Sequence, residues 1–476
     1  SQLGFFLENY CNNINFTSLM NKTKKNIICI FFAIGFSSIL ANPTIYPTGT
    51  TIYDPEKAWN GYVLYASPIG KTHLIDMAGN EVHRWELAGF PSELIDPSIN
   101  GGKKGHLLVQ TKNKAGMWGG IFSNIEIGEV DWDGNIVWRW RGDDPDGAQQ
   151  SHDWARLPNG NTLAVIKEKR IVPDLGDKII ADEAIVEITP NGEEIWRWRA
   201  GDHINEFGLS DEGLDLWRAL IDHSGGLPAG FITINDMAPI GPNKWFDSGD
   251  TRFHPDNIVI DSREGSFIAI IEKSTGSIVW RVGPDYPTMS SPELRPRFDT
   301  HVPRPLDQTS GQHDAHIIPK GLPGEGNLLV FDNNAPSGYP PMRLPMFYGS
   351  RILEINPITK EIVWQYTGIE SGLASWTFSS SFISSARRLP NGNTLIDEGM
   401  NGRMFQVTPD GEIVWEFINP WFGKQTYTVM NDENREISTN WVFRAQPIPY
   451  DWVPEDTPRS ENPVKKLDVT EFRLTE

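Results

Sequence analysis

One pattern of apolar and polar positions recurs along the whole chain. In each copy an apolar strand leads into a short polar turn, and a second strand with alternating side chains ends in tryptophan. Such alternation is the period of a β-strand, and Asp-Gly or Asn-Gly steps in several turns are typical of tight hairpins. The six hairpins end at Trp85, Trp138, Trp196, Trp280, Trp364 and Trp415. The chain is therefore predicted to consist of six repeats.

A second pair of strands precedes the hairpin in most copies. It is visible in residues 152–166, 312–333 and 384–399, where two apolar runs flank a turn rich in Gly, Pro and Asn. Each repeat then holds four strands, A to D in chain order. Six units of this kind predict an all-β fold, a six-bladed β-propeller of four-stranded antiparallel blades. The long insertions 199–230 and 284–310 are expected to be loops on its faces.

The first repeat lacks its strand A, since its apolar pattern begins near Tyr62. The C-terminal segment Asn440 to Gln446 has the composition of a strand. We expect this segment to supply the missing strand and to close the ring, because closure removes the exposed edges of the first and last blades. Residues 42–476 are thus predicted to form one propeller.

Residues 1–41 are interpreted as a leader. Met20 is followed by three lysines, the run from Ile27 to Leu40 is almost wholly apolar, and Ala41 completes a plausible cleavage site. This order is typical of a secretory signal peptide. The apolar run is shorter than the roughly 20 residues of a membrane span, so cleavage is favoured over anchoring. The mature protein is expected in the periplasm or outside the cell, without a stable membrane span.

Composition excludes several classes of chemistry. Both cysteines, Cys11 and Cys29, lie in the predicted leader. The mature chain is therefore expected to have no disulfide, thiol nucleophile or thiolate-bound zinc. The net charge of -20 repels phosphate backbones, so nucleic acid is not an expected partner. No spacing of His, Asp and Glu is specific for a metal, and neither a metal nor a cofactor is predicted.

Propeller geometry gathers polar residues from several blades at one place. Strand A lines the channel and strand B runs antiparallel to it, so the start of A and the end of B meet on one face. The side chains at these positions include His152, Asn235, Gln312, His313, Arg263 and Asn333. Polar groups that converge on one concave mouth are the default candidate for a functional site.

Each candidate also has a structural interpretation. His313 either acts as a nucleophile or caps a neighbouring loop. Arg263 either binds a tetrahedral oxyanion through two parallel hydrogen bonds or forms a surface ion pair. His152 and His313 are each followed by aspartate at the same phase of different repeats, which favours a shared function. His316 is read as structural, because strand alternation turns it away from His313.

The most specific motifs are Gln312-His313-Asp314, residues 329–333 and the stretch from residue 241 to 281. With these motifs the sequence resembles the PAPS-independent aryl-sulfate sulfotransferase family over nearly all of the mature chain. The resemblance implies a propeller with its active site in the central channel. It also implies cofactor-free transfer of a sulfuryl group from a phenolic sulfate ester to a phenol, through a sulfated histidine. The implied partners are small phenolic sulfates and phenols.

The family pattern is carried over residue by residue. It implies that His313 is the nucleophile, His152 the assisting histidine and Arg263 the sulfate-binding arginine. The family's His-x-Asn-Ser segment corresponds to residues 233–236, where Asn235 is kept but Thr233 and Asp236 replace the histidine and the serine. The expected substrate-binding positions are Asn235, Thr233, Gln312 and Asn333.

Other functions remain open from the residues alone. A sulfatase-like variant would use water as the acceptor. A non-catalytic propeller that binds sulfated aromatics or glycans is favoured by Thr233 and Asp236. A quinoprotein-like dehydrogenase shares the tryptophan-ended hairpins, although no vicinal cysteine pair is present after residue 41. A propeller polysaccharide lyase is a further alternative.

Overall fold

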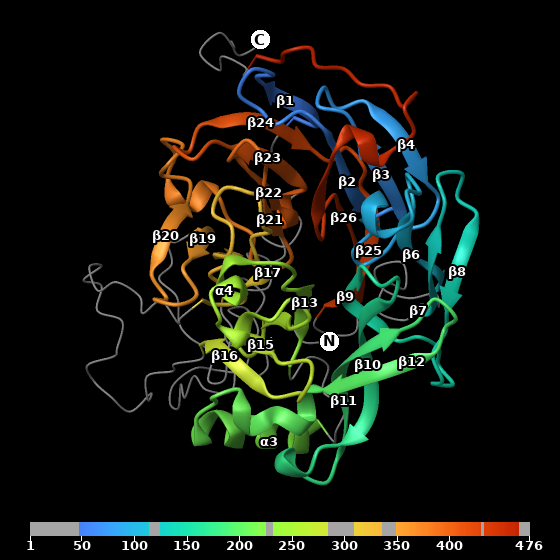
Figure 1. Cartoon of the computed structure of the whole chain (residues 1–476), viewed down its shortest axis with the longest axis vertical. Helices are drawn as coiled ribbons and strands as arrows, with labels where there is room; N and C mark the ends of the chain where they lie inside the picture. The colour runs from blue at the N-terminus through green and yellow to red at the C-terminus, as the bar shows by residue number, and fades with distance from the viewer. Residues whose placement is uncertain are drawn as a thin grey trace, which may run out of the picture.

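The predicted six-bladed propeller is confirmed. The computed structural model describes residues 47–113, 124–224, 232–283, 309–335, 349–429 and 433–465. Six antiparallel sheets surround a central axis, with β9, β13 and β17 near the centre and β8, β12, β16 and β20 at the outside (Figure 1). The predicted leader (residues 1–41) and most of the insertion 284–310 lie outside the described residues.

The strands follow one order in every blade, from the channel outwards. Blade 1 consists of β27 (Ala445–Ile448), β2 (Tyr62–Ser67), β3 (Lys71–Ile75) and β4 (Glu81–Trp85). Blade 2 consists of β5 (Glu93–Leu94), β6 (Leu107–Asn113), β7 (Asn124–Val130) and β8 (Ile136–Trp140). Blade 3 consists of β9 (Gln150–Arg156), β10 (Thr162–Ile171), β11 (Ile179–Ile188) and β12 (Glu194–Arg199).

The other three blades repeat this order. Blade 4 consists of β13 (Ile234–Pro239), β14 (Ile258–Ser262), β15 (Phe267–Ile271) and β16 (Ile278–Val282). Blade 5 consists of β17 (His313–Ile317), β18 (Leu328–Asp332), β19 (Arg351–Ile355) and β20 (Ile362–Tyr366). Blade 6 consists of β21 (Ser385–Arg388), β22 (Thr394–Glu398), β23 (Arg403–Val407), β24 (Ile413–Ile418) and β1 (Gly49–Tyr53). A separate hairpin contains β25 (Gly423–Val429) and β26 (Glu433–Thr439).

The hydrophobic core is divided among the junctions between blades. Each pair of neighbouring blades buries its own apolar cluster, which explains why the strands read as nearly continuous apolar runs. Between blades 5 and 6, for example, Phe331, Phe378 and Phe405 pack together with their rings about edge to face. Both faces of such a strand are buried, so each side chain must fit the neighbours on its own face. Packing therefore fixes the register of the strand.

The repeated tryptophans fasten one blade to the next. The indole N–H on an outer strand donates to a backbone carbonyl in the outer turn of the following blade. Five junctions have this bond: Trp85 to Asp131 (3.1 Å), Trp196 to Lys273 (3.2 Å), Trp280 to Pro357 (2.8 Å), Trp364 to Pro409 (2.8 Å) and Trp415 to Met77 (2.7 Å). The remaining repeat tryptophan, Trp138, has no hydrogen-bond partner for its N–H within the described residues.

This difference gives a matched test of the indole bond. Trp364 and Trp138 are both half-buried, and each lies beneath an arginine, Arg388 or Arg156. We expect Trp364→Phe to lower the free energy of unfolding by about 0.5–1.5 kcal/mol more than Trp138→Phe, because only Trp364 loses a hydrogen bond. Urea unfolding of both variants measures the difference. Equal losses would show that the tryptophans act through packing alone.

A second set of bonds joins the blades at the channel. A polar side chain on the innermost strand accepts the backbone N–H of the next blade's innermost strand. These bonds run from Met237 to Asp153 (2.9 Å), from Asp314 to Asp236, from Ala386 to Asp314 (2.9 Å), from Ala445 to Ser385 (3.2 Å) and from Leu94 to Gln446 (2.8 Å). The innermost strands are therefore held in fixed positions relative to one another.

Both ends of the described chain help to close the ring. β27 pairs with β2, with Tyr62 opposite Ile448 and Tyr65 opposite Ala445. It overlaps the predicted closing segment, residues 440–446, by its first two residues only. At the other side of the junction β1 adds a fifth strand to blade 6 by pairing with β24, which the sequence did not suggest.

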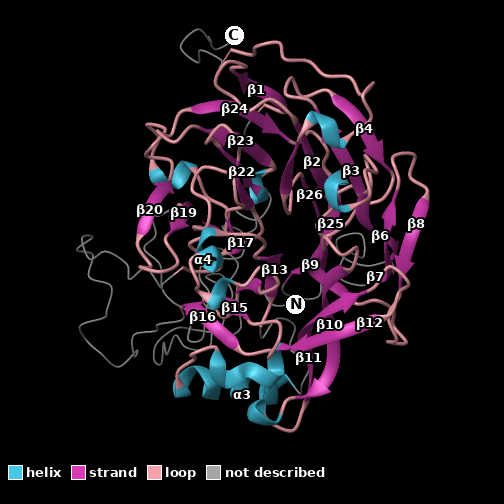
Figure 2. Cartoon of the chain, in the orientation of Figure 1, coloured by secondary structure: helices cyan, strands magenta, loops and turns pink. Residues whose placement is uncertain are grey.

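The insertion 199–230 is not a simple loop. It contains α3 (Asp211–Ser224), which lies outside the ring of strands beside blades 3 and 4 (Figure 2). Leu214, Trp217 and Ile221 recur at helical spacing and are buried in the cluster between these blades. The expectation of a loop was wrong because this apolar face was not recognised. No helix in the described ranges is long and apolar enough to cross a membrane.

Candidate active site

The structure brings the three predicted catalytic residues to one end of the channel strands. His152 lies near the start of β9, His313 begins β17, and Arg263 directly follows β14. Arg263 donates its backbone N–H to the carbonyl of Thr233 (3.1 Å), so the end of strand B meets the start of strand A in blade 4. The side-chain charge of Arg263 is close enough to lower the pKa of both imidazoles.

The ring of His313 is held in one tautomer. Its Nδ1 lies 2.7 Å from Oδ1 of Asn333 and 3.0 Å from the carbonyl oxygen of Gly311. Two acceptors at one nitrogen require that Nδ1 carries the proton. The lone pair therefore lies on Nε2, which accepts the backbone N–H of Ile383 at 3.1 Å.

Both histidines are neutral at ordinary pH. Burial lowers the pKa of His313 to about 3, and the neighbouring charge of Arg263 acts in the same direction. Burial also lowers the pKa of His152 well below its ordinary value, with Lys167, His313 and Arg263 adding to the effect. A neutral imidazole keeps the lone pair that a nucleophile needs.

His152 lies against aromatic rings at the mouth of the channel. Its Nδ1 is 2.6 Å from Oγ of Ser151. Its ring centroid is 5.4 Å from that of Phe90 and 6.2 Å from that of Phe443. Phe443 also lies 6.5 Å from the ring of His313. One phenylalanine therefore contacts both candidate histidines.

Cationic side chains accompany the histidines, although the protein is acidic. Arg263 is three-quarters buried and pairs with Glu264 at 2.9 Å. Lys167 lies at 3.6 Å from the buried Glu183, whose pKa is raised by burial to about 7. These cations make the mouth suitable for an anion in a molecule whose net charge is -20.

The predicted substrate-binding residues differ in their surroundings. Thr233 and Asn235 are buried in blade 4, and Asn235 donates to the carbonyl of Gln312 (3.4 Å). The amide of Gln312 donates to the carbonyls of Ser262 (2.8 Å) and Phe267 (2.9 Å). These bonds join blades 4 and 5, so Gln312 stabilises the contact between the two blades. Its contact with substrate stays a prediction.

Asn333 is hydrogen-bonded to His313. Besides accepting the Nδ1 proton, it donates to the carbonyls of Ser380 (2.7 Å) and Ile383 (2.8 Å). The same side chain thus orients the imidazole and the segment whose N–H meets Nε2. The resemblance implies a substrate-binding role for Asn333, whereas the geometry favours orientation of the His313 ring.

Asp236 does not leave an unpaired negative charge at the site. Its carboxylate binds the guanidinium of Arg444 and accepts the backbone N–H of Asp314. Burial raises the pKa of Asp236, and Arg444 opposes this effect. The aspartate that replaces the family's serine is therefore paired with a guanidinium.

An aromatic cluster at the mouth was missed by the sequence reading. Phe90, Ile383, Trp441 and Phe443 form a separate apolar cluster, with the rings of Phe90 and Phe443 at 3.9 Å. Trp441 and Phe443 lie between β26 and β27, outside the repeat pattern. The available signal was the presence of two large aromatic residues in residues 440–446, the segment that was predicted to close the ring.

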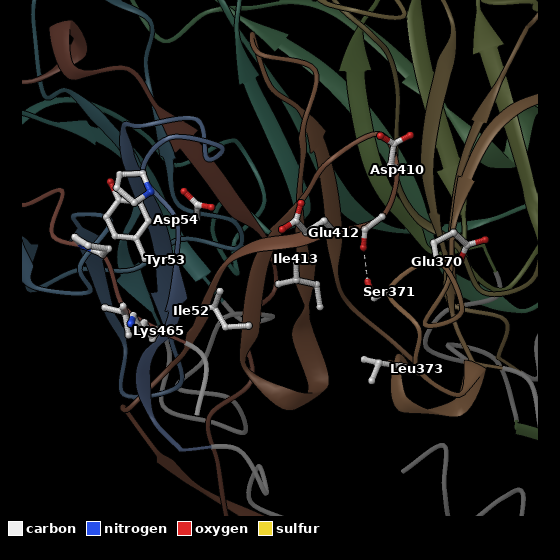
Figure 3. A pocket seen from close by; sticks show the side chains of 14 residues that line it. Ile52, Tyr53, Asp54, Glu370, Ser371, Leu373, Asp410, Glu412, Ile413 and Lys465 are labelled. Atoms are coloured by element: carbon white, nitrogen blue, oxygen red, sulfur yellow. Dashed lines mark hydrogen bonds between the residues drawn. The ribbon is translucent and has the colours of Figure 1, made fainter. Parts of the chain in front are cut away.

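A cleft of about 630 Å³ lies elsewhere, beside β1 and the turn between β23 and β24 in blade 6 (Figure 3). It is lined by the carboxylates Asp54, Glu370, Asp410 and Glu412, together with Lys465. No candidate residue lines this cleft, and its acidic wall does not suit a sulfate ester. Within the described ranges no group of three or more His, Cys, Asp or Glu side chains is arranged to hold a metal ion.

A family model matches most of the chain. The family model described as Arylsulfotransferase (ASST) matches residues 70–435, which include every strand from β3 of blade 1 to β24 of blade 6, and so covers most of the chain. A comparison with curated proteins found no match.

Similar solved structures share little sequence with the chain. A protein of unknown function from Bacteroides caccae is 13% identical, with 82% of this chain and 99% of that chain covered and a TM-score of 0.42. A virginiamycin B lyase from Staphylococcus aureus is 14% identical, with 70% and 80% covered and a TM-score of 0.31. Likenesses at these values do not bear on function. The match over residues 70–435 does, and the chain belongs to the arylsulfotransferase family.

Proposed function

We propose that the protein transfers a sulfuryl group from an aryl sulfate to a phenolic acceptor, with His313 as the covalent carrier. The observation that carries this proposal is the position of two neutral imidazoles around one aromatic ring, with Arg263 beside them. The imidazoles and the cation suit a sulfate ester, and the aromatic cluster suits the aryl group. We further propose that the protein acts in the periplasm or outside the cell.

The first half-reaction would begin at Nε2 of His313. Its lone pair attacks sulfur, the bond between sulfur and the aryl oxygen breaks, and the electron pair of that bond leaves with the phenolate. Asn333 supports this step, because its hold on the Nδ1 proton keeps Nε2 unprotonated. Arg263 and the N–H of neutral His152 would stabilise charge on the sulfuryl and phenolic oxygens.

The N–H of Ile383 must leave the lone pair of Nε2 before attack. Ile383 and Ser384 have φ values of 56° and 99°, in a region that a β-branched residue rarely adopts. A small shift of this segment would turn the N–H of Ile383 from Nε2 toward an oxygen of the sulfuryl group. The donor that covers the resting nucleophile would then stabilise the transferred group.

The second half-reaction returns the enzyme to its starting state. The oxygen of an acceptor phenol attacks the sulfur of the N-sulfate, the nitrogen–sulfur bond breaks, and Nε2 regains its lone pair. The acceptor loses its proton to solvent, because the donor's phenolate has already left the site. Donor and acceptor use the same site in turn, so ping-pong kinetics are expected.

The decisive assay uses p-nitrophenyl sulfate with and without phenol. We expect release of p-nitrophenol to depend on phenol and to be matched by formation of phenyl sulfate, with parallel double-reciprocal lines. Rapid acid-free quenching should yield a sulfated peptide that contains His313. Equal release without phenol would indicate hydrolysis with water as acceptor. Binding of the ester without turnover would favour a non-catalytic binding propeller.

A further inference from the structure

Arg444 lies at the centre of the ring, immediately before β27. Its side chain is only 10% exposed and meets three carboxylates. Nη1 and Nη2 donate to the two oxygens of Asp153, each at 2.9 Å, Nη2 also binds Asp236, and Nε lies 3.4 Å from Asp314. One guanidinium therefore joins the innermost strands of blades 3, 4 and 5.

Each of these aspartates directly follows a candidate site residue. The pairs are His152-Asp153, Asn235-Asp236 and His313-Asp314. Each carboxylate also accepts a backbone N–H from the next blade's innermost strand, at Met237, Asp314 or Ala386. The group that binds all three carboxylates thus sets how the three site-bearing strands lie relative to one another.

The residue before Arg444 reaches the site itself. Phe443 contacts the rings of both histidines, as described above. The segment that closes the ring therefore places an aromatic ring close to both histidines and a guanidinium on the aspartates that follow them.

From this arrangement we propose that Arg444 is a positioning residue for sulfuryl transfer, acting through Asp153, Asp236 and Asp314 on His152, Asn235 and His313. The expected loss of rate rests on the proposed function. The expected change in the titration of His313 does not require turnover.

The remaining charges around Arg444 cannot replace it. Arg387 of β21 also binds Asp314. Glu93 of β5 has a pKa raised by burial to about 7, and burial also raises the pKa values of Asp261 of β14 and Asp397 of β22 well above their ordinary values. Acids therefore outnumber bases here, and no second cation reaches both Asp153 and Asp236 in the described contacts.

Loss of Arg444 would change the site in two ways. Burial already raises the pKa values of Asp153, Asp236 and Asp314, and Arg444 opposes this in each case. Without it the carboxyls take up protons and hold the N–H groups of the next blade less firmly. The positive charge of Arg444 also lowers the pKa of His152 and of His313, so its removal raises both values.

The test compares Arg444→Met and Arg444→Lys with Arg388→Met. Arg388 is an equally buried arginine that pairs with Glu354 at 2.7 Å between blades 5 and 6, away from both site histidines. Circular dichroism and thermal unfolding establish that each variant is folded. Activity is measured from pH 4 to 8 with p-nitrophenyl sulfate and phenol. The titration of His313 is followed by NMR with ¹³C-labelled histidine, assigned with His313→Asn.

We expect Arg444→Met to lose at least about 100-fold in kcat, the scale of a misplaced catalytic group. Its His313 titration should move upward by about one pH unit, because a nearby positive charge is gone. Arg444→Lys should lose rate with little change in titration, and it also provides the folded variant if Arg444→Met does not fold. Arg388→Met should keep the parent's rate and titration.

Two results would overturn the proposal: an Arg444 variant with the parent's rate, or Arg388→Met with the same losses as Arg444→Met. If the parent itself does not transfer sulfate, the proposed function fails. The upward titration of His313 in Arg444→Met, absent in Arg388→Met, would still show that Arg444 acts on His313. An unchanged titration would then refute it.

Discussion

His313→Asn is expected to abolish sulfuryl transfer, with kcat falling by at least about 1000-fold, because the nucleophile itself is removed. Asparagine is smaller than histidine and still offers a polar group to Asn333 and Ile383, the partners of the native ring. The measurement is the rate of p-nitrophenol release in the presence of phenol, together with the sulfate content of the quenched protein.

The matched control is His316→Asn. His316 lies on the same strand and is buried, with Nδ1 2.8 Å from the carbonyl oxygen of Asp314. Its loss should lower stability and leave the covalent step intact. A fully active His313→Asn variant, or one that still accumulates protein-bound sulfate, would show that another group carries the sulfuryl.

The second large effect is expected for Arg263→Lys, with kcat falling by roughly 100-fold, the scale of one lost oxyanion contact. Lysine keeps the positive charge but has a single point of attachment, whereas the guanidinium can bind two oxygens at once. The charge near His313 is retained, so the pH dependence should stay that of the parent while the rate falls. Steady-state kinetics from pH 4 to 8 measure both quantities.

Glu264→Gln is the control for Arg263→Lys. Glu264 pairs with Arg263 at 2.9 Å, and its replacement tests whether the ion pair alone matters. We expect a much smaller loss, since the guanidinium and its two donors remain. If Arg263→Lys keeps the rate of the parent, Arg263 contributes charge only. If both variants fail equally, the ion pair rather than the sulfate contact is essential.

The repeat made the fold predictable from the sequence. Six tryptophan-ended hairpins specified six blades, and the missing first strand near Tyr62 specified closure by the C-terminal segment. The reason is physical: each tryptophan binds a carbonyl of the next blade, so the same residue is needed at the same phase of almost every repeat. Because the same contact is made at most junctions between blades, the same residue recurs in the sequence.

The candidate site was predictable only in part. His152, His313 and Arg263 occupy positions that propeller topology defines, so their convergence followed from the repeat. Topology does not say whether an amide faces substrate or protein. Gln312 directly precedes β17 and Asn333 directly follows β18, and the structure gives Asn333 a bond to His313 and Gln312 bonds to blade 4.

Residues outside the repeat were the ones that sequence reading missed. Arg444 binds Asp153 and Asp236, which are far from it in the chain, and nothing in the local pattern marks these contacts. For the same reason, the pairing of Asp236 with Arg444 could not be inferred from the sequence. The helix α3 was missed because the helical spacing of Leu214, Trp217 and Ile221 was not recognised in a stretch that was expected to be a loop.

Closure of the ring by β27 has a consequence for biosynthesis. The edge of β2 is covered only by residues 445–448, so a nascent chain exposes this edge until nearly all of the described propeller has left the ribosome. An uncovered strand edge is a template for pairing with other chains. Premature association is therefore a hazard of synthesis, and it should be most acute in chains that stop short of Ile448.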